Sequence, residues 1–140
     1  MAFTLSNNQN GENFNVTYVL PATSGTTWEC GEALVFTGGV IVKAGAAVKP
    51  TWLSARSGSP SSPDNLFPVN VVVDTHFYQS FMAAGQAAPN IGDDLQLSAD
   101  GLYLMAATGG PFEVLAVDTL KNGEIRVVGR FIDVAAPEEN

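Results

Sequence analysis

His76 and Cys30 are the two side chains in this sequence that most readily do acid–base, metal or nucleophilic chemistry. His76 is the only histidine, and a cupin-type metal site needs several. We therefore expect a structural or exposed histidine that could still make a pH-sensitive contact. Cys30 is the only cysteine and lies between Glu29 and Glu32. Because a reactive thiol needs electropositive neighbours, we predict that Cys30 is inert.

Three aspartates cluster near a predicted turn, namely Asp93, Asp94 and Asp100. Carboxylates on a loop could bind calcium. The EF-hand spacing is absent, however, and an aspartate before a glycine, as in Asp100-Gly101, has an ordinary role in turns. We therefore predict no metal site. No phosphate-binding glycine loop or nucleophile elbow is present either, so we predict no catalytic residue, no cofactor and no enzymatic activity.

Trp28 and Trp52 suggest a different chemistry, the stacking of sugar rings on an aromatic platform, as in jelly-roll lectins. Tryptophans more often lie in a core or in an interface, where they bury a large apolar area. A small jelly-roll carbohydrate-binding module is therefore the alternative function, and an aromatic interface is the preferred role of these two residues.

The charge pattern argues against several classes of partner. The 140 residues carry a formal net charge of −8, and the six Lys and Arg residues are scattered along the sequence. Without a basic stripe, we expect no nucleic-acid binding. Only 14% of the residues are charged, which leaves a surface poorly protected against association. A signal-peptide pattern and a membrane-length apolar run are both lacking, so we expect no membrane partner and folding in a reducing cytoplasm.

Short strands are predicted in the first ninety residues. A glycine pair, Gly38-Gly39, predicts a hairpin turn. Three prolines and four serines make 56–68 irregular, and Gly85 and Pro89 restrict 79–88 to an irregular segment or one short helix. The predicted strands are 14–20, 32–36, 40–43, 51–55 and 69–74, the last of which could continue to 78.

The segment 91–131 has the clearest pattern, four short apolar runs separated by glycine turn signals. Runs of this length and spacing predict an antiparallel meander in a sandwich or small barrel. The runs are 95–97, 102–107, 112–117 and 125–131, and the turn signals are Asp100-Gly101, Gly109-Gly110 and Asn122-Gly123.

Together these elements predict one all-β domain over 14–134, either a jelly-roll-like antiparallel sandwich or a small β-barrel. The loops 21–27 and 56–68 are long enough to cross between two sheets, which favours the jelly roll over a simple meander barrel. No internal repeat and no linker divides the segment.

Residues outside this domain are expected to behave differently. We interpret 1–13 as an N-terminal arm, because Phe3 and Leu5 precede a polar elbow rich in asparagine. Such an arm could add a strand to a neighbour or fill a groove on it. The alternative is that the same residues form an edge strand of their own domain. Residues 135–140 are expected to fray.

Several motifs together resemble the capsid decoration, or cement, proteins of tailed bacteriophages. The similar layout covers about residues 31–131, and its motifs consist of turn glycines and core positions. The blocks are Gly31–Phe36, Lys49–Leu53, Ile91–Leu95, Asp100–Leu102, Gly110–Val114 and Gly123–Phe131.

The resemblance implies an all-β protein that binds the major capsid protein on the outside of an HK97-type shell and stabilises it. It implies synthesis in the bacterial host cytoplasm and a final place on the outer capsid surface of the virion. Self-association is also expected, as a homodimer first and a trimer next, since two-fold interfaces are the commonest. The predicted interface side chains are Phe3, Leu5, Trp28, Trp52, Leu66 and Phe67.

Overall fold

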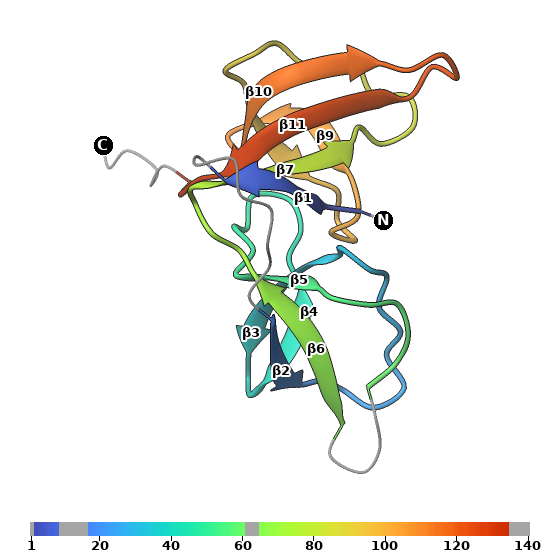
Figure 1. Cartoon of the computed structure of the whole chain (residues 1–140), viewed down its shortest axis with the longest axis vertical. Helices are drawn as coiled ribbons and strands as arrows, with labels where there is room; N and C mark the ends of the chain where they lie inside the picture. Colours follow the sequence, from blue (N-terminus) through green and yellow to red (C-terminus); the bar gives the residue numbers. More distant parts are fainter. Residues whose placement is uncertain (1, 9–16, 61–64, 135–140) are drawn as a thin grey trace.

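The computed structural model describes residues 2–8, 17–60 and 65–134, which form eleven strands. The strands make two antiparallel sheets in a sandwich-like single domain, and Figure 1 shows the six-stranded sheet above the five-stranded one. This confirms the predicted all-β sandwich, whereas the alternative, a closed barrel, is not found. Within the described ranges, no helix is present that is long and apolar enough to cross a membrane.

The two sheets draw their strands from both halves of the sequence. The six-stranded sheet has the order β1 (Thr4–Asn8), β7 (His76–Phe81), β11 (Ile125–Phe131), β10 (Phe112–Thr119), β8 (Asp94–Leu97) and β9 (Leu104–Thr108). The five-stranded sheet has the order β2 (Thr17–Pro21), β6 (Leu66–Val71), β5 (Trp52–Ser54), β3 (Ala33–Thr37) and β4 (Val40–Lys43).

Two predicted hairpins are confirmed, because their turn residues determine the pairing locally. Gly38 and Gly39 have φ of 63° and 86°, the positive values that a two-residue type I′ turn needs, and they join β3 to β4. In the β10–β11 turn, Gly123 also has a positive φ, and the Asn122 side chain accepts a hydrogen bond from the Glu124 amide.

The predicted meander over 91–131 is wrong at one connection. β10 pairs with β8, opposite Leu95, rather than with β9, the strand that precedes it. Gly109-Gly110 is therefore not a hairpin turn. A Cβ at Gly110 would lie 2.1 Å from the carbonyl oxygen of Leu95, so a glycine is needed where the chain passes close to β8.

The crossings between the sheets also differ from the prediction. The loops 21–27 and 56–68 each connect two strands of the five-stranded sheet, so neither crosses. The chain crosses instead at 72–75, within the segment where a strand over 69–74 was predicted that could continue to 78. Figure 1 shows β6 leading up from the lower sheet toward the upper one. The Val73 amide donates to the buried Tyr78 hydroxyl, which stabilises this crossing.

Two segments predicted as irregular contribute to strands. β6 begins at Leu66 and includes Pro68, whose carbonyl accepts from Ala55. Pro68 has no N–H to donate, and it lies opposite Ala55, one residue beyond the end of β5, where the β5–β6 pairing ends. The short helix considered over 79–88 is absent, since its first three residues complete β7.

The first residues belong to the domain and do not form a free arm. β1 pairs with β7, and the Phe3 amide donates to the carbonyl of Gly31. Phe3 is 2% exposed and Leu5 is buried beside it in the main core. The edge-strand alternative therefore describes residues 2–8. Residues 9–13 and the predicted tail 135–140 lie outside the described ranges.

Apolar side chains form two cores. The main core lies against the six-stranded sheet and contains an aromatic cluster in which neighbouring ring centroids are 5.1–5.8 Å apart. A smaller core lies against the five-stranded sheet. The cluster consists of Phe3, Tyr78, Phe112 and Phe131. The smaller core contains Ala22, Trp28, Leu34, Ile41, Phe67 and Val69.

Candidate functional site

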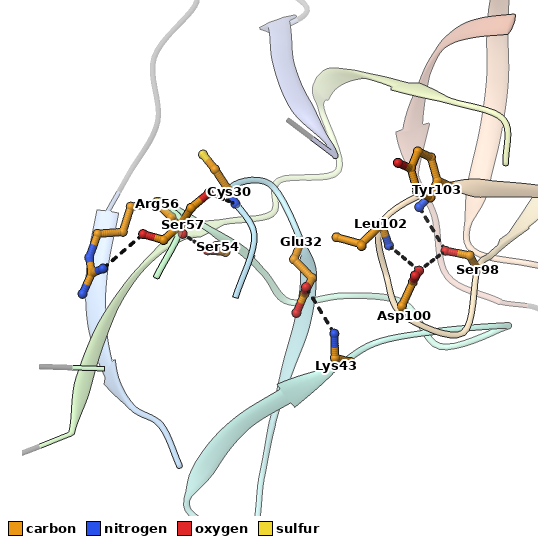
Figure 2. Close-up of polar contacts among 10 residues, drawn as sticks. All are labelled: Cys30, Glu32, Lys43, Ser54, Arg56, Ser57, Ser98, Asp100, Leu102 and Tyr103. Atoms are coloured by element: carbon orange, nitrogen blue, oxygen red, sulfur yellow. Dashed lines mark hydrogen bonds and ion pairs between the residues drawn. The ribbon is translucent and has the colours of Figure 1, made fainter. Parts of the chain in front are cut away.

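The side chains of His76 and Cys30, the two most reactive in the sequence, are buried and half-buried, respectively. His76 is buried at the start of β7, with its ring centroid 6.3 Å from that of Tyr78. Cys30 is half-buried, and Figure 2 shows its backbone amide donating to the Ser57 hydroxyl at 3.0 Å. Its carbonyl accepts from Ala2, so the Cys30 backbone holds the start of the chain. The inertness of its thiol stays a prediction.

The three aspartates do not form one cluster: Asp93 lies in the turn before β8, Asp94 is the first residue of β8, and Asp100 lies in the turn after β8. Asp93 accepts a hydrogen bond from the Asn90 amide at 2.9 Å. Asp100 accepts from the Ser98 hydroxyl and from the Leu102 amide, as Figure 2 shows. Over the ranges that the structure describes, no three His, Cys, Asp or Glu side chains are placed to hold a metal ion. These two aspartates act as turn caps here.

Glu32 is a buried charged residue to which the sequence patterns assigned no role. Its side chain is 2% exposed, one oxygen lies 3.3 Å from the Lys43 ammonium, and Oε2 has no hydrogen-bond partner among the described residues. In Figure 2 this pair joins the residue just before β3 to the last residue of β4. Burial raises the pKa of the Glu32 carboxyl, and the charge of Lys43 opposes that rise. We therefore expect the stability of the protein to depend on pH through this carboxyl group.

Four of the six predicted interface side chains lie inside the cores. Phe3, Leu5, Trp28 and Phe67 are buried and present almost no surface to a partner. Their apolar character is used by the chain itself, for example where the Trp28 ring packs 6.4 Å from that of Phe67. The interface role predicted for these four is therefore replaced by a core role.

The remaining two predicted interface residues reach the surface. Trp52 and Leu66 are half-buried on β5 and β6. The Trp52 ring lies edge-on to Tyr18, with centroids 5.5 Å apart and an interplanar angle of 72°. Because Trp28 is buried, the two tryptophans do not form a shared exposed platform for a sugar.

An exposed apolar surface lies on the β2–β6 pair. Val19 is directly opposite Pro68, and Pro21 is directly opposite Leu66. Opposed residues of an antiparallel pair, and residues two apart along a strand, point to the same face. These four side chains, which we call the β2–β6 strip, therefore form two adjacent rungs at the edge of the five-stranded sheet. Val19 is 56% exposed, Pro21 is exposed, and the other two are half-buried.

Neither a search of protein-family models nor a search of curated proteins finds a match to this chain.

Proposed function

We propose that this protein is a structural cement, or decoration, protein that binds the outer surface of an HK97-type phage capsid through the β2–β6 strip. The observation that carries the proposal is the strip itself, an uncharged apolar surface on the edge strand β2 and its neighbour β6. Exposed contiguous apolar groups rimmed by polar residues mark surfaces that bind other proteins. The motif resemblance supplies the identity of the partner, the major capsid protein.

The strip has the composition of a small interface. The rung next to it is polar, because Thr17 donates a hydrogen bond of 2.6 Å to the Asn70 side chain on the same face. An apolar centre with a polar rim is the usual anatomy of protein–protein contacts. Two of the four strip residues are prolines, which lose little conformational freedom on binding. The surface is thus already ordered before it meets a partner.

Co-sedimentation with expanded capsids that lack the protein tests this function. We expect the intact protein to sediment with the shells, and Val19→Asp or Leu66→Asp to remain in the supernatant at the same concentration. Ile91→Asp is the matched control, because Ile91 is 72% exposed on the loop before β8 and lies outside the strip. Failure of the intact protein to bind, or equal loss with all three variants, would contradict the proposal.

Self-association is part of the same proposal. The low fraction of charged residues and the exposed strip favour a homodimer in solution, with a trimer as the next choice. Light scattering of the free protein measures the molar mass directly. A strict monomer, both free and on the capsid, would contradict it.

The alternative, carbohydrate binding, has support from one observation. Tyr18 is half exposed and contacts the edge of Trp52, so an aromatic surface remains on the other face of the β2–β6 pair. A glycan array with the intact protein and with Tyr18→Ala distinguishes the two functions. A signal that depends on Tyr18 would favour the carbohydrate-binding module over the cement protein.

A further inference from the structure

A groove lies at one end of the six-stranded sheet, away from the β2–β6 strip. It consists of two adjoining cavities of about 520 and 190 Å³, which share Phe81, Tyr103 and Glu124 in their walls. The walls come from the end of β7 and its following loop, from the β8–β9 loop, and from the β10–β11 turn. In Figure 1, that turn and the loop after β7 lie on the same side of the sheet. We call this feature the end groove.

The charged residues in the walls of the end groove are both acidic. Glu124 lines both cavities and Glu29 lines the smaller one, while no Lys, Arg or His contributes to either wall. Among the described residues, no ion pair involves these two carboxylates. Glu124 is positioned by a hydrogen bond of 2.7 Å from the Asn122 side-chain amide. The nearby Arg126 is already paired with Asp118.

Aromatic side chains complete the end groove. Phe81 is half-buried, and Tyr103 is 44% exposed with its backbone fixed by a hydrogen bond from its amide to the Ser98 hydroxyl, visible in Figure 2. An aromatic ring beside a carboxylate suits a guanidinium, which stacks on the ring and donates paired hydrogen bonds to the acid. This chain uses the same stacking internally, since the Arg56 guanidinium lies 4.5 Å from the Phe67 ring centroid.

We propose that the end groove binds an arginine side chain presented by a partner protein. The two carboxylates supply the charge complement, Phe81 and Tyr103 supply the stacking surfaces, and the net charge of −8 attracts a basic partner. Lysine fits less well, because its compact ammonium is strongly hydrated and lacks a planar face. This inference goes beyond the capsid proposal and does not depend on it, since it uses other residues at another end of the molecule.

Nuclear magnetic resonance titration with N-acetyl-arginine amide tests the inference at constant ionic strength. We expect saturable shifts of the Gly85 and Gly123 backbone amides, which line the larger cavity. The isosteric neutral analogue, N-acetyl-citrulline amide, should leave them unchanged. Glu124→Gln and Glu29→Gln should each raise the dissociation constant by about fivefold, and Tyr103→Ser by a similar factor.

Asp94→Asn is the matched charge control, because Asp94 lies opposite Glu113 near the far end of β10 and does not line the groove. It should bind the arginine compound like the intact protein. Equal shifts with citrulline, no shifts with arginine, or a preference for N-acetylglucosamine at the same amides would each overturn the proposal. The spectrum of each free variant shows whether it is folded. Capsid co-sedimentation is measured separately, so either proposal can fail alone.

Discussion

A buried carboxyl that keeps one charged neighbour makes the stability of a protein depend on pH. Glu32 is such a group, because desolvation raises its pKa above the ordinary value of 4.5 while Lys43 opposes the rise. When the folded-state pKa lies above the unfolded one, the folded state binds the proton more tightly. The contribution to stability is then fully present below about pH 4.5 and is lost as the pH rises through the folded-state pKa.

Glu32→Gln should remove this loss of stability, because the amide does not titrate. We expect the free energy of unfolding of the intact protein to fall from pH 4.5 upward by an amount that is absent in the variant. Urea unfolding at several pH values measures the difference. Glu124→Gln, at an exposed position, is the control and should keep the pH dependence of the intact protein. Identical pH profiles for Glu32→Gln and the intact protein would contradict the prediction.

The Tyr78 hydroxyl makes a buried hydrogen bond between two uncharged groups. It accepts the Val73 amide at 3.1 Å within the crossing between the sheets, and burial raises the pKa of the phenol. Tyr78→Phe keeps the ring packing and removes only this acceptor. We expect a loss of about 1 kcal/mol in the free energy of unfolding, measured by chemical denaturation. An unchanged unfolding midpoint would show that the hydrogen bond makes no net contribution.

At the scale of elements, the position of β8 between β9 and β10 depends on one close approach. Gly110→Ala places a Cβ 2.1 Å from the Leu95 carbonyl, so the backbone of β8 or β10 must move. We expect a destabilisation of about 2–4 kcal/mol, seen as a lower melting temperature. Gly109→Ala is the matched control, because its Cβ meets nothing within 4 Å and only its positive φ is unfavourable. That variant should lose about 1 kcal/mol.

The sequence predicted those elements whose pairing is determined locally. The Gly38-Gly39 and Asn122-Gly123 turns join strands that are neighbours in the chain, so turn chemistry and alternation were sufficient. The pairing of β10 with β8 and the crossing at 72–75 depend on contacts between distant segments, which no local pattern encodes. A β-branched run followed by His76-Phe77-Tyr78 reads as one strand, although its halves belong to different sheets.

The β2–β6 strip was predicted only in part, because exposure also depends on contacts between distant segments. Leu66 and Trp52 were expected at an interface and do reach the surface. Pro21 and Pro68 were interpreted as loop residues, although both lie in paired strands. Exposure depends on which face of the β2–β6 pair the rest of the molecule covers, and alternation alone does not reveal that.

At the scale of the whole molecule, the first strand completes the main core. Phe3 packs with its ring centroid 5.8 Å from that of Phe112 and 5.3 Å from that of Phe131. Phe3→Ala should therefore cost about 3–5 kcal/mol of unfolding free energy, measured by thermal or urea denaturation. An unchanged melting temperature would mean that residues 2–8 do not pack as described. Tyr18→Ala, at a half-exposed aromatic, should cost much less.

The pairing of β1 with β7 has a consequence for how the protein is made. β1 is synthesised some seventy residues before its pairing partner β7, and Phe3 packs on Phe131, which is synthesised later still. Until that distant segment is synthesised, the apolar side chains of β1 have no native surface to cover them. Non-local pairing of this kind slows folding and prolongs the exposure of nascent chains. Chaperone demand during translation should therefore be greater before β11 emerges than after it.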